Sequence, residues 1–296
     1  MIRVIRLVAC YGTITAGIPY VVLKVIWVLG IPVGMTGASH VAELLDRAHV
    51  VGNVVTIGLE VVAIALALAF TYAWGRSIPG PLVLVPIWVG TGLLAPIVLG
   101  VPTGVLLQLV VGGSPSPDPQ AAGWIFAMVY GGFTAQAIFL CAAFVLYARE
   151  RWGHVFERAD GRADQIQVML ANGAAIPAAA YGVIHLVWTF AGDRLAGPAG
   201  FETAAQRTAL FVTGVVVIGG AVGVMALVRQ RRTTATLTLA WVGAATTFAS
   251  GLHGINSGGV TGLIFEAGML AGLLLGVAGL LNLAQPCLVD KRHYVK

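Results

Sequence analysis

The stretch NVVTIGLEVVAIALALAFTYAW, residues 53–74, decides the fold class. It runs for 22 residues with Glu60 as its one charged side chain. A helix rises 1.5 Å per residue, so about 20 apolar residues cross the roughly 30 Å hydrocarbon core of a bilayer. The stretch therefore predicts a transmembrane helix.

Seven further apolar stretches of similar character predict seven more spans. They lie near residues 7–30, 82–111, 124–147, 166–190, 210–227, 237–252 and 260–281. Over the whole chain, 58% of the residues are hydrophobic and 10% are charged, which is far from the composition of a water-soluble domain. We expect an all-α polytopic membrane helix bundle with about eight transmembrane helices.

The basic residues predict the orientation of these spans. Of the 17 Lys and Arg residues, thirteen fall at the two termini and in three alternate loops, three fall on the other side, and Lys24 lies inside a span. The positive-inside rule then places both termini in the cytoplasm of a multi-pass protein of the cell membrane. Because the net charge of +5 comes from these short loops, we expect no nucleic-acid partner.

Two similar stretches predict an internal repeat. Residues Tyr20-x3-Lys24-x2-Trp27 and Tyr181-x3-His185-x2-Trp188 follow one pattern at an offset of 161 residues. We interpret residues 1–147 and 166–296 as two tandem four-helix repeats, joined by a basic cytoplasmic linker at 148–165. Each repeat has an even number of spans, so the two are expected to be parallel.

The ionisable residues inside the spans are expected to meet at one level. Counting 1.5 Å per residue from the predicted span ends places five of them roughly 10 Å below the outer interface. These five are Lys24, Glu60, His185, His253 and Glu266. A charged side chain at this depth costs about 2.5–3.5 kcal/mol on insertion scales, so pairing or function must offset that free energy.

Structural explanations compete with a functional one at several of these positions. Lys24 could extend to the headgroups, His185 could donate to a carbonyl, and the tryptophans could form an interfacial belt. The two glutamates are harder to explain in this way, because a short carboxylate side chain cannot reach the interface. The predicted catalytic residues are Glu60, Glu266, Lys24 and His185, and the predicted substrate-binding residues are Tyr20, Trp27, Tyr181, Trp188, Trp124 and His253.

These residue types point to acid–base chemistry on a lipophilic substrate. A carboxylic acid in a low-dielectric pocket can stay protonated near neutral pH and give up its proton, while a second one beside Lys24 acts as a base. Rings of Tyr and Trp can shelter a carbocation between the two steps. We expect no metal and no cofactor, because the chain has no DDxxD-type acidic cluster and its three cysteines lack metal-site spacing.

The eight-span layout and the stretch from Tyr20 to Trp27 resemble uncharacterised actinobacterial eight-span membrane proteins. The chain is also similar in size, span count and composition to bacterial membrane-bound terpene cyclases of drimentine-type indole sesquiterpenoid pathways. This resemblance implies proton-initiated cyclisation of a farnesylated acceptor, with Glu60 or Glu266 as the acid.

Other functions remain open at the level of sequence. Parallel repeats with intramembrane carboxylates also suit a proton- or ion-coupled transporter. His185 and His253 could be axial ligands of a haem, and the chain could be a non-catalytic membrane subunit. The substrate and the oligomeric state do not follow from the sequence.

Overall fold

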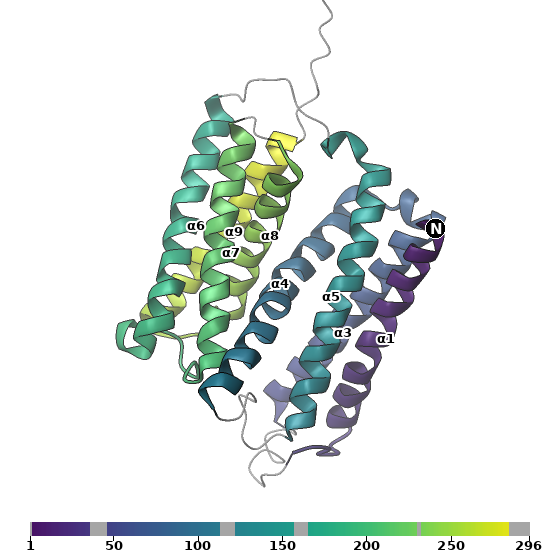
Figure 1. Ribbon diagram of the computed structural model, residues 1–296, viewed down its shortest axis with the longest axis vertical. Coiled ribbons are helices and arrows are strands. Elements are labelled where there is room, and N and C mark those ends of the chain that lie inside the picture. Colours follow the sequence, from purple (N-terminus) through teal and green to yellow (C-terminus); the bar gives the residue numbers. More distant parts are fainter. Residues whose placement is uncertain (1, 36–45, 113–121, 157–164, 230–231, 284–296) are drawn as a thin grey trace, which may run out of the picture. The chain divides into compact units, whose positions relative to one another are not determined.

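The computed structural model describes residues 2–35, 46–112, 122–156, 165–229 and 232–283 (Figure 1). Helices make up nearly all of this part of the chain. In chain order the elements are α1 (Ile2–Val28), α3 (Arg47–Thr71), η1 (Ala73–Ser77), α4 (Gly80–Val111), α5 (Gly123–Arg151), η2 (Gly153–Phe156), α6 (Gln165–Ala191), η3 (Gly192–Leu195), α7 (Ala204–Val228), α8 (Thr234–His253) and α9 (Gly259–Leu283).

Eight of these helices are long and apolar enough to cross a membrane, and they coincide with the eight predicted spans. Their outward faces carry large apolar side chains such as Ile176, Phe190 and Val110, which are more than 70% exposed. A water-soluble protein would bury side chains of this kind, whereas lipid tails solvate them. The chain is therefore a polytopic helical membrane protein, as the sequence predicted.

Helix α3 begins earlier than the predicted span. The span was expected to begin at Asn53, but α3 begins at Arg47 because Asp46 acts as its N-cap, with the side chain accepting a 3.1 Å hydrogen bond from the Ala48 amide. An N-cap aspartate satisfies one of the free amides of the first turn. Glu60 consequently lies thirteen residues, or about 20 Å, along the helix.

The described chain divides into two compact units. Unit 1 comprises Met1–Gly90, Ile97–Arg151 and Thr203–Ala205, and unit 2 comprises Thr91–Pro96, Trp152–Glu202 and Gln206–Lys296. The division at Arg151 and Trp152 falls inside the predicted linker 148–165, of which residues 157–164 lie outside the described part. The proposed sequence repeat between the two halves stays a prediction.

Unit 1 is built around the packing of α1, α3 and α5, which lie side by side in Figure 1. Glycines allow α1 and α5 to approach closely: a Cβ on Gly132 would lie 2.9 Å from the backbone oxygen of Ala16. At one end, Glu150 of α5 pairs with Arg6 of α1 and Arg76 of η1. Glu150 thus links α5 to α1 and to the segment that follows α3.

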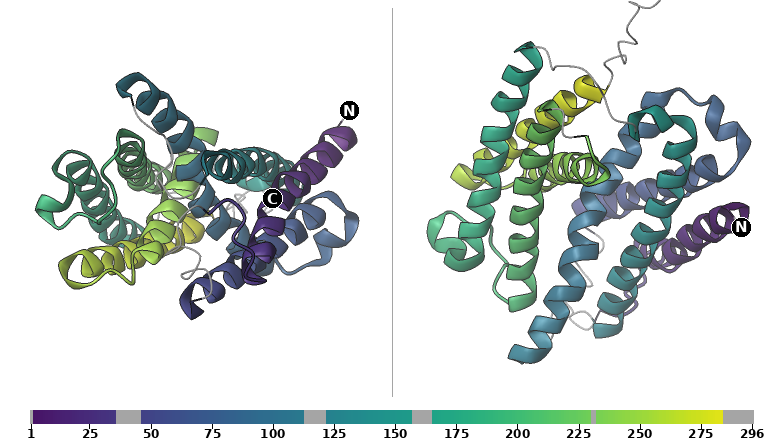
Figure 2. Two further views of the ribbon diagram at one scale, coloured as in Figure 1. Left: turned by 90° about the horizontal axis from the view of Figure 1, so that it is seen from below. Right: turned by 45° about the horizontal axis from the view of Figure 1, so that its top comes forward.

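Unit 2 is a bundle of α6, α7, α8 and α9, drawn in green to yellow in Figure 2. Helix α9 packs against α6 and α8. Helix α7 packs closely against both α6 and α8. A Cβ built on Gly182 of α6 would lie 2.9 Å from the backbone oxygen of Gly214 in α7, and a Cβ built on Gly220 of α7 would lie 2.6 Å from the Cα of Gly243 in α8. Such short distances show that small residues set the helix spacing.

Candidate functional site

Glu60 is the buried acid of unit 1. Its side chain lies in the interior between α1, α3 and α5 and is 6% exposed. Gln136 of α5, which is 1% exposed, donates a 2.6 Å hydrogen bond from Nε2 to Oε2 of Glu60. On the α1 side, Gly17 leaves room for the carboxyl group, because a Cβ added to this glycine would lie 2.7 Å from Oε2 of Glu60. The predicted burial of Glu60 in protein is confirmed.

The partner of Glu60 is a neutral amide. A carboxylate taken out of water needs a cation or several donors, whereas Gln136 provides one amide donor. The Oε1 atom of Gln136 is buried and has no hydrogen-bond partner. The described contacts therefore give the carboxyl group one neutral donor and no cation.

Lys24 was expected beside one of the two glutamates, and in the structure it contacts Asn53. Its Nζ atom donates a 2.8 Å hydrogen bond to Oδ1 of Asn53 in α3 and lies 4.8 Å from the ring centroid of Trp27. Lys24 lies seven residues after Gly17 on α1, and Asn53 lies seven residues before Glu60 on α3, which separates the two contacts by about 10 Å. The predicted common level is therefore wrong for Lys24 and Glu60, because Asn53, and not Glu60, lies opposite Lys24 on α3.

Tyr20 lies between these two contacts. Its ring is 8% exposed and packs edge to face against Phe133 of α5, with 4.7 Å between the ring centroids. On α3, Thr56 donates its hydroxyl to the backbone oxygen of Asn53 at 2.9 Å. Trp27, 7% exposed, donates from Nε1 to the backbone oxygen of Val33 at 3.1 Å and so fixes the chain beyond α1. A substrate-binding role for Tyr20 and Trp27 stays a prediction.

In the repeated Tyr-to-Trp pattern, His185 of unit 2 stands at the position that Lys24 holds in unit 1. Aromatic rings surround it. The ring is 2% exposed and lies 4.4 Å from the ring centroid of Tyr181, 5.1 Å from that of Trp188 and 6.1 Å from that of Phe265. Nδ1 lies 3.1 Å from the backbone oxygen of Tyr181. A carbonyl can only accept, so Nδ1 carries the proton, in agreement with the donor role considered for this residue.

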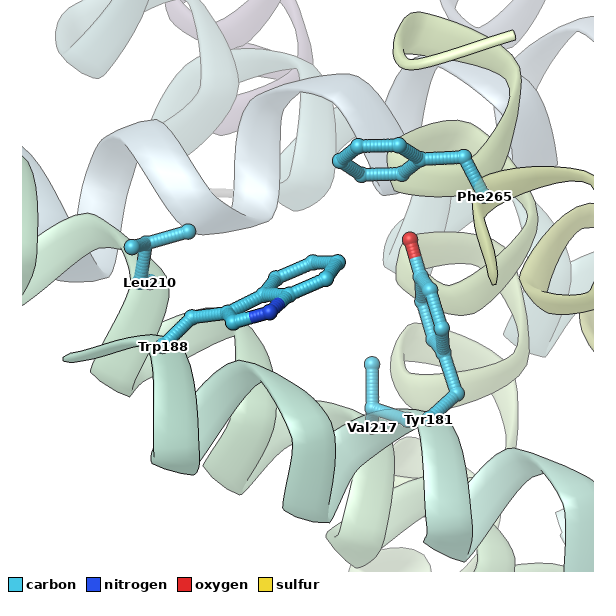
Figure 3. Close-up of a cluster of buried hydrophobic side chains, with 5 residues drawn as sticks. All are labelled: Tyr181, Trp188, Leu210, Val217 and Phe265. Atoms are coloured by element: carbon cyan, nitrogen blue, oxygen red, sulfur yellow. The ribbon is translucent and has the colours of Figure 1, made fainter. Parts of the chain in front are cut away.

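Tyr181 and Trp188 belong to the packed core of unit 2. Figure 3 shows both rings beside Phe265, with Leu210 and Val217 on α7 completing the cluster. The hydroxyl of Tyr181 donates to Ser250 of α8 at 3.2 Å. Trp188 donates from Nε1 to the oxygen of Leu195 at 3.0 Å, much as Trp27 does to Val33. The geometry assigns these side chains a structural role, and the predicted binding of substrate by them stays a prediction.

The other predicted site residues lie on the surface. Glu266, His253 and Trp124 are exposed, Trp124 to 50%. Glu266 does not share the enclosed environment of Glu60, so the expectation that both carboxyl groups are covered by protein is wrong for Glu266. Glu60 and Lys24 belong to unit 1, whereas His185, His253 and Glu266 belong to unit 2, and a common pocket for the two sets stays a prediction.

Sequence reasoning missed Asn53 and Gln136, the amide side chains that contact Lys24 and Glu60 in unit 1. A search for ionisable residues alone passes over them, although an amide inside a span is itself a signal because it needs a partner there. Within the described residues, no three His, Cys, Asp or Glu side chains are grouped closely enough to hold a metal ion. Comparison of the chain with protein-family models, curated proteins and solved structures finds no match.

Proposed function

We propose that this protein is an integral-membrane enzyme that protonates a lipophilic substrate, with Glu60 as the acid. The observation that carries the proposal is the 2.6 Å hydrogen bond between Gln136 and Glu60, in an interior where the described contacts give the carboxyl no cation. This environment favours the neutral acid, which is the form that can donate a proton. The proposal needs neither a metal ion nor a cofactor.

The chemistry that fits is cyclisation or isomerisation started by a proton. The Glu60 O–H bond breaks as its proton forms a bond to one carbon of an alkene, leaving a carbocation at the other carbon. Ring closure moves the positive charge, and loss of a different proton to a base forms the product double bond. Substrate and product have the same mass, and the ionised Glu60 takes up the released proton.

The aromatic surroundings of Glu60 support this chemistry. The Tyr20 and Phe133 rings lie in the same interior of unit 1 as the acid, and aromatic faces stabilise a cation by about 0.5–2 kcal/mol each. A terpenoid chain is the substrate class that combines alkenes with solubility in lipid. We propose a farnesylated aromatic acceptor as the first substrate to test, and a cell membrane with both termini in the cytoplasm as the location.

A proton-coupled transporter is the second candidate. The same contact between Glu60 and Gln136 would serve a carrier that binds and releases a proton at an intramembrane carboxyl group. The two candidates differ in their products, because a transporter moves its substrate unchanged whereas the enzyme converts it into an isomer. Assays that follow both uptake and chemical conversion separate them.

The experiment compares membranes that contain the wild-type chain, Glu60→Gln or the control Glu202→Gln, each supplied with a farnesylated indole. Glu202 is exposed, in the segment between η3 and α7. Chromatography with mass detection should find an isomer of unchanged mass from the wild type and the control. Glu60→Gln should lower its yield by about 100-fold or more, as expected for loss of a general acid. Equal yields from all three would refute the enzyme proposal.

A further inference from the structure

One end of unit 1 gathers arginines around a single acid. Glu150 of α5 accepts hydrogen bonds from Arg6 of α1 and, at 2.9 Å, from Arg76 of the short helix η1. The arginines of these three elements form the arginine cluster and are Arg3, Arg6, Arg76, Arg149 and Arg151. Because Glu150 is the only acidic residue in α1, η1 and α5, the cluster with its acid has a net charge of +4.

The two arginines that contact Glu150 retain hydrogen-bond donors and can be reached from outside. Arg76 is exposed and Arg6 is partly exposed. Each donates to Glu150 from a terminal nitrogen, and within the described residues the Nε atom of Arg6 has no hydrogen-bond partner. A guanidinium group presents its donors as a planar fork that matches the oxygens of a phosphate group. The shared carboxylate therefore holds two such forks beside each other.

An apolar stripe runs along α1 from the arginine cluster. Its large side chains recur every three, four or seven residues, which places them on one face of the helix. Each is more than 40% exposed, and they are Val4, Val8, Tyr11, Ile18, Val22 and Val25. The Tyr11 hydroxyl lies 3.1 Å from that of Tyr72, and Tyr72 and Trp74, just before Arg76, are both exposed. Exposed Tyr and Trp rings favour the level of the lipid headgroups.

We propose that the arginine cluster binds the phosphate group of an anionic membrane lipid whose acyl chains lie against the stripe on α1. The positive charge of the cluster attracts the phosphate, and this attraction alone would also suit a free anion. The stripe favours a lipid, because an inorganic phosphate ion has no apolar part to place against it. The inference goes beyond the role proposed for Glu60 and does not depend on it.

Glu150 positions the two guanidinium groups and also opposes the ligand. Its carboxylate holds Arg6 and Arg76 together, but its negative charge repels an incoming phosphate. In Glu150→Gln the amide oxygen can still accept a hydrogen bond from an arginine, while the opposing charge is gone. This variant should therefore bind the lipid at least as tightly as the wild type.

Native mass spectrometry of the full-length protein, released from detergent micelles, tests the proposal by counting bound lipids. The protein is titrated with anionic phosphatidylglycerol or with zwitterionic phosphatidylcholine, and the wild type should prefer the former. The double variant Arg6→Gln with Arg76→Gln should bind phosphatidylglycerol about 25-fold more weakly, since each arginine near an anionic lipid contributes about fivefold in affinity. Its affinity for phosphatidylcholine should not change.

A matched control removes the same charge from unit 2. Arg194→Gln with Arg207→Gln changes two exposed arginines there and should leave phosphatidylglycerol binding at the wild-type level. Glu150→Gln breaks the same ion pairs as the arginine variant, so it separates loss of lipid binding from loss of folding.

Three results would overturn the proposal. The first is equal affinity of the wild type for the two lipids, or an Arg6 and Arg76 double variant that binds phosphatidylglycerol as the wild type does. The second is a loss in Glu150→Gln as large as that in the arginine variant, because the ion pairs rather than the positive charge would then hold the lipid. The third is displacement of the lipid by an equal concentration of inorganic phosphate, which would indicate a site for a free anion.

Discussion

Gly17 and Glu60 face each other so closely that a single added carbon on the glycine would lie 2.7 Å from Oε2 of the acid. The carboxyl group is the end of a flexible side chain, so it would move and the helices would stay in place. The hydrogen bond from Gln136 depends on that carboxyl position. The missing side chain of Gly17 is thus what allows the acid and the amide to meet.

Substitution of Gly17 should accordingly affect activity more than stability. In Gly17→Ala the displaced carboxyl group should lower product formation by about tenfold to a hundredfold, which is typical of a catalytic group misplaced by an ångström. Thermal unfolding in detergent should change little. The matched control is Gly58→Ala on α3, where a Cβ meets no atom within 4 Å. Its activity should stay at the wild-type value, and its stability should rise by about 0.5–1 kcal/mol. Full activity in Gly17→Ala would show that the carboxyl position is unimportant.

The pair formed by Glu60 and Gln136 should behave as one energetic unit. Gln136→Leu leaves the buried carboxyl without its donor and should lower the free energy of unfolding by about 1–3 kcal/mol. The double variant Glu60→Leu with Gln136→Leu should be destabilised by less than the two single variants together. Intramembrane hydrogen bonds predict a coupling of about 0.6–1.7 kcal/mol. Strictly additive effects in this double-mutant cycle would mean that the two side chains do not interact.

The close approach of α7 and α8 predicts a different response in unit 2. A Cβ on Gly220 would lie 2.6 Å from the Cα of Gly243, and a backbone cannot give way as a side chain can. Gly220→Ala should therefore destabilise the protein by about 1–3 kcal/mol. Gly173→Ala on α6, which points into open space, should instead stabilise it by about 0.5–1 kcal/mol through reduced backbone entropy. Similar unfolding temperatures for the two variants would contradict the α7–α8 packing.

Much of the fold could be predicted from the sequence because the bilayer restricts what an apolar stretch can form. A run such as residues 53–74 can only become a helix in lipid, so the eight spans follow from composition and length. The seven-residue spacing from Tyr20 to Trp27 likewise predicts that both rings share a helix face, and both are buried in unit 1.

The partners of these residues could not be predicted in the same way. Whether Glu60 meets Lys24 or Gln136 depends on how α3 packs against α1 and α5, and there Gly17 leaves the space for the carboxyl group. Asp46 was an available signal for the first residue of α3, because an aspartate before a helix marks its start. The exposure of Glu266 depends on the packing of α9 against its neighbours, which apolar periodicity does not specify.

The central claim is that Glu60 transfers its own exchangeable proton to a carbon atom of the substrate. The most direct measurement incubates wild-type and Glu60→Gln membranes with the farnesylated indole in D2O and examines the product by mass spectrometry. The account predicts one non-exchangeable deuterium in each molecule of product from the wild type, and almost no product from Glu60→Gln. A product free of deuterium, or equal amounts of labelled product from both proteins, would contradict it.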